Sequence, residues 1–453
     1  MCRDGSLQGL CEATRACSFP DANCGSGRRY GSASAAALAL TCVDGTPPDG
    51  GAADGPPAPH CGELGEPCCA GATACTSPMT CTMGVCSGCV TAVATGDAHT
   101  CALRTNGTVV CWGKNDAGQL GTGNTADSLA PALVIAPGGA PLDGVIELAA
   151  GAAHTCARRS AGTVLCWGNG SDGQLGDAAS PPTQSTPGLI GISDLGDIAA
   201  GSRHSCAALN DGRAYCWGKN DGGQLGTPPP AGTNGPAAVL IGGTQLDNVA
   251  RMAGGATHTC AIRKDQTLWC WGSNNAGELG NGGTSASAGP VAVSVLGAML
   301  ADVSAGSAFT CAALASGGVS CWGADLQGQS GQPASPSVSV PTAIAGLTLV
   351  TQLAAGTDHV CARRSDGTAV CWGRNQRGQL GDSTQADRAQ FAPVLDPANQ
   401  PVTHVTRVAA GLAHGCAIRA QGVICWGANE SGQLGDGKLQ DRTTATTSLM
   451  ACP

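Results

Sequence analysis

Short runs of Val, Leu, Thr and Trp, bounded by Gly, Asn and Asp, follow one another along most of this chain. Two such runs, 99–104 and 108–112, flank a Thr-Asn-Gly segment. Runs of this kind around a Gly-containing turn predict a β-hairpin. A further strand is predicted before the hairpins, as at 145–149 and 405–409, and another after them, as at 131–135 and 341–344.

This pattern recurs seven times, each time with a Cys-Trp-Gly triplet and an earlier Cys. Successive copies of the earlier Cys lie 55, 50, 54, 51, 50 and 55 residues apart. Repeats of this length, with four short strands in each, predict an all-β fold: a seven-bladed β-propeller with four-stranded blades. A solenoid of the same units is the alternative, and it would need polar caps at both ends.

The two cysteines of each copy are predicted to face each other across the hairpin. With a three-residue turn centred on Asn106, Cys101 lies opposite Cys111, and the seventh copy keeps this pairing because its turn is one residue shorter. A directly opposite pair at the non-hydrogen-bonded spacing suits a disulfide. The expected disulfides are Cys101–Cys111, Cys156–Cys166, Cys206–Cys216, Cys260–Cys270, Cys311–Cys321, Cys361–Cys371 and Cys416–Cys425.

A zinc site is the alternative for these cysteines, because His-x-Cys and the second Cys could offer three ligands on one strand face. The fifth copy argues against zinc, since Phe309 replaces His while Cys311 and Cys321 remain. We therefore expect no metal site and no cofactor.

Other repeated residues are predicted to build the fold. A Gly three residues before each His position, such as Gly96, indicates a tight turn or a close backbone approach. The six repeated His are assigned to structural hydrogen bonds, and Asn115 and its counterparts to Asx-turns or left-handed backbone. No helix follows the Gly-Gln-Leu-Gly turns, so a phosphate-binding interpretation of them is weak.

His-x-Cys-Ala-Leu, Cys-Trp-Gly-x-Asn and Gly-Gln-Leu-Gly, repeated from residue 90 onward, resemble the regulator-of-chromosome-condensation repeat. The resemblance implies a seven-bladed propeller. The founding member of that family is a nuclear guanine-nucleotide exchange factor, whereas other members only bind proteins, among them a secreted bacterial inhibitor of β-lactamase. The seven Cys pairs depart from the nuclear member and favour a secreted bacterial type with a Cys-rich N-terminal region.

The charge balance narrows the classes of partner. Lys and Arg number 23 against 32 Asp and Glu, which gives a net charge of −9. Nucleic-acid binding needs a basic face, and none is obvious here. No apolar run is long enough to span a membrane. We expect an unidentified protein partner, no nucleic acid, no membrane span and a monomeric chain.

Cysteine usage bears on location. The chain has 27 Cys, a density typical of proteins outside the reducing cytosol, so we expect a secreted, periplasmic or cell-surface protein. Met1-Cys2-Arg3 begins no signal peptide and the Cys count is odd. Both observations lead to the expectation that the true start, with its signal, lies upstream.

Composition divides the chain into four parts. Residues 1–45 are expected to be a Cys-rich leader, and the Pro/Gly-rich segment 46–60 a disordered linker. Residues 61–89 form a knottin-like Cys-rich module whose disulfide connectivity the sequence does not fix, with a zinc ribbon as the alternative. Residues 90–453 form the propeller.

Three classes of function compete. The favoured one is an extracytoplasmic, non-enzymatic protein-binding scaffold; the alternatives are an exchange-factor-like regulator and a propeller-based hydrolase or lyase. Neither Gly-x-Ser-x-Gly nor His-Glu-x-x-His occurs. The repeated His and Asp are symmetric, whereas an active site needs one asymmetric cluster. No catalytic residue is therefore assigned.

Two surfaces are candidates for binding. The segments after Gly-Gln-Leu-Gly do not repeat, and variable loops on a rigid scaffold often carry recognition; these are 122–130, 177–188, 227–235, 281–289, 332–340 and 382–392. Cations at the hairpin turns form the other candidate, because they could line one rim and attract an acidic partner; these are Arg104, Arg158, Arg159, Arg263, Lys264, Arg363, Arg364 and Arg419.

Closure of the ring is expected to mix strands from both ends of the propeller. Cys89 opens the first repeat and Cys452 is next to last in the chain. We predict a Cys89–Cys452 disulfide that clasps the ring. The alternative is that Cys89 pairs inside the Cys-rich module.

Overall fold

The computed structural model describes residues 89–177, 181–294, 296, 299–333, 335–419 and 422–450, with the backbone of six short strands before residue 89. The chain divides into two units, Met1–Gly88 and Cys89–Pro453. In the first unit, one sheet contains β1 (Cys2–Asp4), β2 (Leu7–Cys11), β3 (Cys17–Pro20) and β4 (Arg28–Tyr30), and one hairpin contains β5 (Met79–Thr82) and β6 (Val85–Gly88). The leader, linker and Cys-rich module predicted there fall largely outside the described residues.

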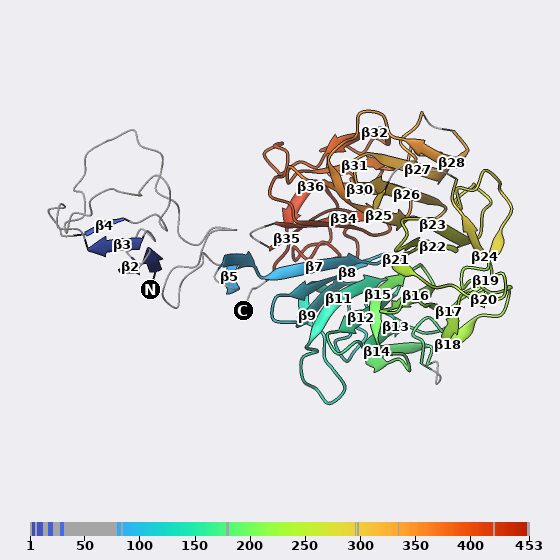
Figure 1. Ribbon diagram of the computed structural model, residues 1–453, viewed down its shortest axis with the longest axis horizontal. Helices are drawn as coiled ribbons and strands as arrows, with labels where there is room; N and C mark the ends of the chain where they lie inside the picture. The colour runs from blue at the N-terminus through green and yellow to red at the C-terminus, as the bar shows by residue number, and fades with distance from the viewer. Residues whose placement is uncertain are drawn as a thin grey trace. The chain divides into compact units, whose positions relative to one another are not determined.

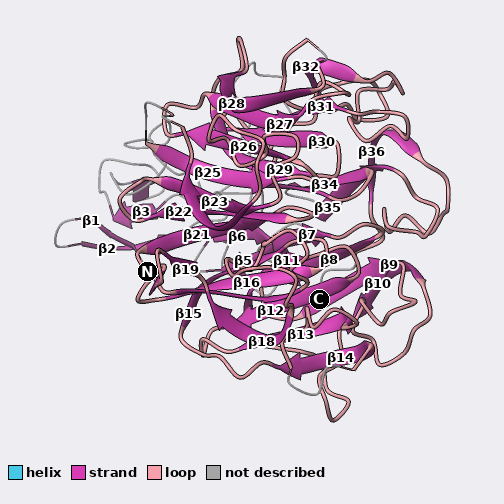
Figure 2. Ribbon diagram, turned by 90° about the vertical axis from the view of Figure 1, so that its right-hand side faces the viewer, coloured by secondary structure: helices cyan, strands magenta, loops and turns pink. Residues whose placement is uncertain are grey.

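The second unit is a propeller of seven four-stranded antiparallel sheets, which confirms the fold predicted from the sequence (Figure 1). Each sheet, here called a blade, uses four strands that follow one another in the chain. The innermost strand of every blade lines a central channel. Figure 2 shows strands and loops, and the described residues contain no helix.

The strand bounds are regular from blade to blade. Blade 1 is β7 (Val90–Thr95), β8 (His99–Arg104), β9 (Val109–Gly113) and β10 (Ser128–Leu133), and blade 2 is β11 (Val145–Ala150), β12 (His154–Arg159), β13 (Val164–Asn169) and β14 (Thr183–Leu189). Blade 3 is β15 (Leu195–Ala200), β16 (His204–Leu209), β17 (Ala214–Gly218) and β18 (Thr233–Ala238), and a small hairpin, β19 (Leu240–Ile241) and β20 (Thr244–Gln245), follows it. Blade 4 is β21 (Val249–Gly254), β22 (His258–Arg263), β23 (Leu268–Gly272) and β24 (Ser287–Ala292).

The remaining blades repeat the same arrangement. Blade 5 is β25 (Leu300–Ala305), β26 (Phe309–Leu314), β27 (Val319–Ala324) and β28 (Ser337–Ala343). Blade 6 is β29 (Val350–Ala355), β30 (His359–Arg364), β31 (Ala369–Gly373) and β32 (Arg388–Pro393), and blade 7 is β33 (Arg407–Ala410), β34 (His414–Arg419), β35 (Gly422–Gly427) and β36 (Arg442–Thr447).

The outermost strands begin and end earlier than the sequence suggested. β10 runs from Ser128 to Leu133, not over 131–135, and β28 runs from Ser337 to Ala343, not over 341–344. β10 ends because the Ile135 amide leaves the blade ladder and donates to Gly121 O at 2.8 Å, while Val134 turns into the core. Tertiary packing therefore overrides the local pattern here.

The hairpin register follows the predicted count. Arg104 N donates to Thr108 O, which leaves a three-residue turn, and Gly107 takes the positive φ of 79° that this turn requires. Cys101 therefore lies opposite Cys111, with a Cα–Cα distance of 4.1 Å. In blade 7, Arg419 pairs with Gly422 across the shorter turn.

Hydrophobic cores lie between adjacent blades. Seven clusters of buried residues occur among the described residues, and each draws on two neighbouring blades. Between blades 1 and 2, Leu103, Val109 and Leu120 pack with Trp167. The Trp of every Cys-Trp-Gly triplet is at most 1% exposed. One Trp buries roughly 150–250 Å², so it supplies bulk to interfaces otherwise built from Ala, Val and Leu.

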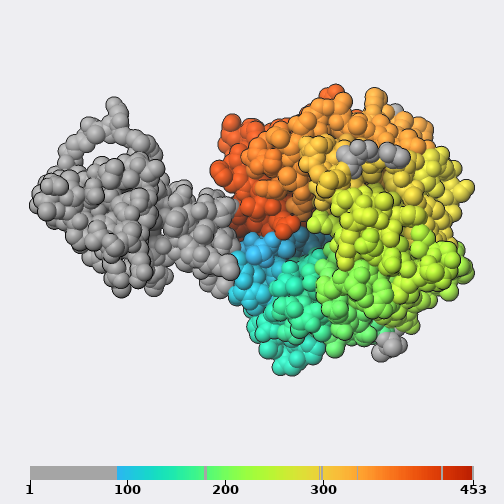
Figure 3. Space-filling model, in the orientation of Figure 1, coloured from blue at the N-terminus to red at the C-terminus, as the bar shows by residue number. Residues whose placement is uncertain are grey.

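The ring closes without exchange of strands. Blades 1 and 7 each use four consecutive strands, and β33 and β34 contact β7. Figure 3 shows the first, blue blade beside the last, red one. Across this junction, Thr100 Oγ1 and Trp112 Nε1 donate to Gln433 O at 2.8 and 2.9 Å. The expectation of mixed strands is wrong, because this junction makes the same contacts as the other blade junctions and needs no borrowed strand.

No helix in the described part of the chain is long and apolar enough to cross a membrane.

Candidate functional site

The antiparallel order of the strands gives the propeller two distinct faces. The turn between the second and third strand of each blade, with its repeated cations, lies on one face, which we call the hairpin face. The turn between the first and second strand lies on the opposite face, together with the Gly-Gln-Leu-Gly turn and the variable segment after it. We call this second face the loop face. The two binding surfaces predicted from the sequence are therefore on opposite sides of the molecule.

A polar belt joins each blade to the next. Thr155 Oγ1 donates to Gln119 O at 3.1 Å, and Trp167 Nε1 donates to the same oxygen at 2.9 Å. Because the Thr155 hydroxyl proton is committed to Gln119, His99 Nε2 must be the donor in its 2.9 Å contact with Thr155 Oγ1. The same contacts recur at the junction of blades 7 and 1.

Burial makes the belt histidines poor acids or bases at neutral pH. Desolvation, followed by the charge of His154, lowers the pKa of His99 to about 3. All six His at this position are fully buried. Hydrogen bonding fixes five of them between blades, as the sequence suggested: His99, His154, His204, His258 and His414.

The polar belt is interrupted at two blade junctions, and only one of the two interruptions is compensated. Phe309, which replaces His in blade 5, faces blade 6, where Val360 replaces the hydroxyl residue. His359 of blade 6 faces blade 7, where Gly415 replaces the hydroxyl residue, and its Nε2 makes no hydrogen bond. The first pair exchanges both polar groups for apolar ones, whereas the second leaves a buried nitrogen unpaired.

The repeated Gly before each His permits a close approach of blades, as predicted. A Cβ on Gly96 would collide with the His99 ring and with Gly151 O of blade 2. Backbone bonds join successive blades here from blade 1 to blade 6, as from Asp97 N to Ala152 O at 3.1 Å. This ring of glycines lines the loop-face end of the channel.

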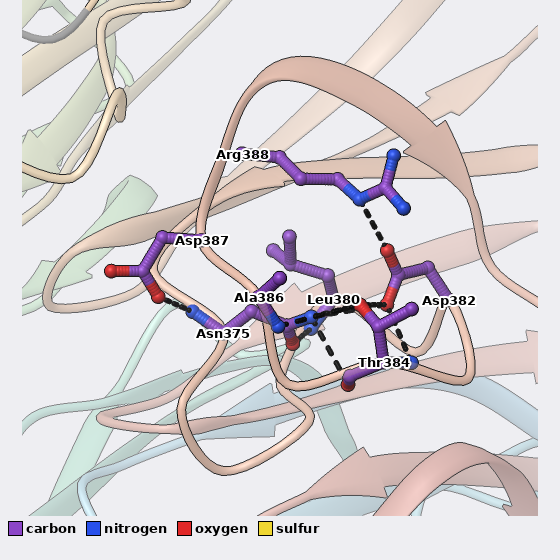
Figure 4. A network of polar contacts seen from close by, with 7 residues as sticks. All are labelled: Asn375, Leu380, Asp382, Thr384, Ala386, Asp387 and Arg388. Carbon is purple, nitrogen blue, oxygen red and sulfur yellow. Dashed lines mark hydrogen bonds and ion pairs between the residues drawn. The ribbon is translucent and has the colours of Figure 1, made fainter.

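The repeated Asn anchors the variable loops to the rigid part of each blade. In blade 6, Leu380 N donates to Asn375 Oδ1 at 3.0 Å, which locks the Gly-Gln-Leu-Gly turn (Figure 4). Asn375 Nδ2 donates to Thr384 O at 3.1 Å and to Asp382 Oδ1 at 3.0 Å, which fixes the start of the variable loop. The expectation of a left-handed Asn is wrong: the positive φ in this turn falls on Gly378, at 79°.

An ion pair completes the anchor. Asp382 Oδ2 lies 2.6 Å from Arg388 Nε, and Asp387 Oδ1 accepts the Asn375 amide at 2.7 Å (Figure 4). Blade 7 repeats this arrangement with Asn429, Asp436, Arg442 and Asp441. The polar residues at the base of these loops are therefore framework.

Two blades lack the Asn. Blade 2 has Gly170, whose amide donates to Pro182 O at 3.0 Å. Blade 5 has Asp325, which accepts the Ser330 amide at 2.8 Å but has no N–H group to offer the loop when ionised. Burial raises the pKa of Asp325. Neither residue therefore offers its loop the side-chain amide that Asn supplies in the other blades.

Most of the predicted hairpin cations are engaged within the blades. Arg158 pairs with Glu147 at 2.6 Å, and Arg159 pairs with Asp143. The Nε groups of four Arg at the ends of the second strands each donate to a carbonyl oxygen sixteen residues earlier, which ties the hairpin to the chain that leads into its blade; these are Arg159, Arg263, Arg364 and Arg419. Arg363 Nε donates to Val405 O at 2.8 Å, and Lys264 Nζ to Asn210 O at 3.1 Å. Arg104 occupies the same turn of blade 1 and is partly buried.

Seven cysteine pairs lie at disulfide distance inside the blades, with Cα–Cα distances of 4.0–4.1 Å. Their geometry is that of the directly opposite pairs in the hairpin register. Cys89 is fully buried and takes part in a disulfide. Cys452 lies outside the described residues, so the Cys89–Cys452 clasp stays a prediction.

The sequence analysis did not predict one asymmetric cluster of mostly polar side chains, which lies in the central channel. One position of the innermost strand is not repeated from blade to blade, although it lies among apolar neighbours; its residues are Ala92, Glu147, Asp197, Arg251, Asp302, Gln352 and Arg407. These residues line the hairpin-face end of the channel. Aligning the seven repeats would have exposed this position as the polar, variable one in an otherwise apolar strand.

The family follows from a comparison with known domains. A model of the RCC1-like domain matches residues 60–345, and models of the RCC1 repeat match residues 350–379, 405–433 and 366–418. The chain belongs to the RCC1-like domain family. The seven-bladed propeller described above is thus that of an RCC1-like domain.

Similar proteins differ widely in size. The E3 ubiquitin-protein ligase HERC2 of Homo sapiens is 32% identical over 257 residues, which cover 56% of this chain and 4% of HERC2. The ultraviolet-B receptor UVR8 of Arabidopsis thaliana is 43% identical over 83 residues, 18% of each chain. The chain therefore spans only a small part of these curated relatives.

Solved structures share the fold of this RCC1-like chain. Human WBSCR16 superimposes with a TM-score of 0.63 at 24% identity, over 72% of this chain and 86% of that one. Yeast RCC1 (Prp20), in its complex with Kap60, gives a TM-score of 0.64 at 20% identity, over 75% and 83%. These likenesses establish the propeller and nothing more specific.

Proposed function

We propose that this RCC1-like chain is an extracytoplasmic, non-enzymatic scaffold that binds a protein partner through the variable loops of its loop face. The observation that carries the proposal is the contrast within each loop. In blade 6 the base of the loop is pinned by Asn375, whereas Gln385 and Ala386 beyond it are exposed. Exposed, variable segments on a rigid framework are a common design of binding surfaces.

The disulfides support the extracytoplasmic part of the proposal. Cystine pairs in every blade would persist only in an oxidising compartment. Fold similarity to yeast RCC1, which was crystallised with the protein Kap60, supports protein binding by this architecture. The exchange-factor-like and hydrolase or lyase alternatives have no site-specific observation in their favour.

The hairpin-face cations form a weaker candidate surface, since most of them already bond within the blades. An acidic partner would have to compete with these internal contacts. Arg363 and Arg419 are the informative positions for a test, because their guanidinium groups donate to uncharged oxygens.

Loop replacement tests the proposal. The oxidised chain, immobilised, is incubated with culture or periplasmic fluid. In each variable segment the exposed residues outside the anchor, such as 385–386 in blade 6, are replaced in turn by Gly-Ser of equal length. Retention of a specific protein should be lost for two or three adjacent blades. Replacing the exposed hairpin-face connection 137–140 by Gly-Ser is the matched control and should change nothing.

Two other results would contradict the proposal. Binding that survives every loop replacement but is lost on Arg363→Glu or Arg419→Glu would assign the partner to the hairpin face. Nucleotide release from a GTPase, or turnover of glycans or peptides, would move the chain to one of the alternative classes.

A further inference from the structure

The hairpin-face end of the central channel is an asymmetric, charged cavity. Its volume is about 550 Å³, which falls in the range of roughly 300–1,000 Å³ typical of small-ligand sites. The non-repeated position of the innermost strands contributes the charges of Glu147, Asp197, Arg251, Asp302 and Arg407, with Arg158 beside them.

Part of this polarity is structural. The innermost strands turn a free edge to the channel, and side chains of one blade cap amides of the next. Asp197 Oδ2 accepts the Met252 amide at 2.8 Å, and Gln352 Oε1 accepts the Val408 amide at 3.0 Å. Because Gln352 performs this task without charge, capping alone does not require a carboxylate at the equivalent position 197.

Two of the charged side chains in the cavity, Asp197 and Arg407, take no part in its ion pairs. Glu147 pairs with Arg158 at 2.6 Å, and Asp302 with Arg251 at 2.7 Å. Asp197 Oδ1 has no hydrogen-bond partner among the described residues, and Arg407, which is exposed, forms no ion pair with any of them. One carboxylate and one guanidinium are therefore available to a ligand.

The electrostatics around Asp197 favour a cation. Burial, and then the charge of Glu147, raise the pKa of Asp197 to about 8, although Arg251 and Arg158 act in the opposite direction. A positive group bound here would relieve this unfavourable charge. Asp302 and Arg407 are the remaining charged groups that line the cavity.

We propose that this cavity binds a small zwitterion, an amino acid whose ammonium group pairs with Asp197 and Glu147 and whose carboxylate pairs with Arg407. Blades 3 and 7, which carry Asp197 and Arg407, lie on opposite sides of the ring. Blade 1, between blades 7 and 2, lines the cavity with the uncharged residues Thr91, Ala92 and Val93, so no charge of blade 1 competes for the ligand. The proposal does not depend on which face binds a protein.

Calorimetric titration of the full oxidised chain tests the proposal. Glycine, 4-aminobutyrate and 6-aminohexanoate measure the span between the charges, and butylamine and butyrate offer one charge each. One of the amino acids should bind at least about tenfold more tightly than either single-charge compound, since a charge-assisted hydrogen bond is worth about ten- to hundredfold in affinity.

Variants assign the groups. Asp197→Asn keeps an acceptor for the Met252 amide but removes the charge, and Arg407→Gln removes the guanidinium; each should weaken binding by about tenfold or more. Arg213→Gln, on the hairpin face outside the cavity, is the control and should have no effect. If Asp197→Asn fails to fold, Arg407→Gln decides alone, because Arg407 is exposed and holds no ion pair among the described residues.

The pH dependence gives an independent readout. Binding should tighten as pH rises from 6 to about 9, because Asp197 must be ionised to pair with an ammonium group. Proton release on binding should appear as a dependence of the measured heat on the buffer. No binding of any amino acid at about 10 mM, or binding of butylamine that equals theirs and ignores Arg407→Gln, would overturn the proposal.

Discussion

At the scale of single residues, departures from the repeat are more informative than the repeat itself. Asn375 and its counterparts fasten a turn and a loop with one side chain, and their amide groups donate and accept at once. Asp325 accepts but cannot donate when ionised. Phe309 and Val360 replace both partners of a polar contact by apolar side chains. His359 Nε2, in contrast, stays without a hydrogen bond because Gly415 has no side chain to accept it.

Asp325→Asn should stabilise the chain by about 1 kcal/mol at pH 7, because the amide restores a donor to the blade 5 loop and removes a buried charge. The pKa of Asp325 is raised by burial, so its stabilising protonated form is lost as pH rises. The increase in the free energy of unfolding caused by Asp325→Asn should therefore shrink as pH falls. Denaturant titrations at several pH values measure this increase. Asn375→Asp is the mirror control and should destabilise; a gain independent of pH would contradict the explanation.

Phe309→His and Val360→Thr should show favourable coupling. Phe309→His alone buries an unpaired imidazole and should cost about 1–3 kcal/mol, whereas the double variant recreates the contact that His99 makes with Thr155. A double-mutant cycle measures the coupling, for which we expect roughly 1 kcal/mol or more. A coupling energy near zero would mean that the belt contact adds no stability.

At the scale of elements, the hairpin is the unit that each repeat encodes. Its turn, its register and its Cys pair are all decided within about a dozen residues. The anchored loop is the next unit: the Gly-Gln-Leu-Gly turn and the Asn before it hold the base of a segment whose sequence is free to vary. Framework and variable surface thus alternate along the chain.

Replacing Cys101 and Cys111 together by Ala should lower the free energy of unfolding by about 3 kcal/mol, since the crosslink restricts a short loop in the unfolded chain. Denaturant titration with and without reductant measures the effect. Peptide mapping of the untreated protein should recover the seven pairs within blades. Fourteen alkylated propeller thiols in the native protein would contradict both the disulfides and the extracytoplasmic proposal.

At the scale of the whole molecule, the propeller is a closed ring of equivalent junctions. Blades 7 and 1 meet through the same Thr, Gln and Trp contacts as their neighbours. Closure therefore relies on a junction repeated around the ring, and the predicted Cys89–Cys452 disulfide would add to it. The charged cavity and the variable loops break this symmetry at opposite faces.

The free energy of unfolding of the propeller should fall steeply as the pH is lowered. Burial lowers the pKa of His99, His204 and His414 to about 3, and of His154, His258 and His359 to about 4, from an ordinary 6.5. Below pH 6.5 the unfolded chain takes up protons that the folded chain cannot, so stability present above that pH is lost as pH falls. Each His contributes about 1.4 kcal/mol per pH unit down to its folded pKa.

A pH series of denaturant titrations measures this slope. His99→Gln should reduce it by about one proton between pH 6 and 4.5. His404 is exposed and has a φ of 58°, so His404→Asn, which tolerates that backbone, is the control and should leave the slope unchanged. A stability that stays constant from pH 7 to 4.5 would contradict the burial of neutral histidines.

The sequence by itself determined the number of blades, the hairpin register and the pairing of cysteines within blades. These features depend on spacings inside one repeat, and seven copies make the spacing unambiguous. Cys416 and Cys425 show this well, because a turn shortened by one residue still leaves them opposite each other.

Only the tertiary structure decided what happens between repeats. Which hydroxyl accepts from His99 and how Thr100 meets Gln433 both depend on residues brought together by packing. The charges of the channel mouth, such as Asp197 and Arg407, lie in different repeats and converge only when the ring closes. A pattern read along one strand carries no information about a neighbour some fifty residues or more away, and that is why the candidate ligand site appeared only in three dimensions.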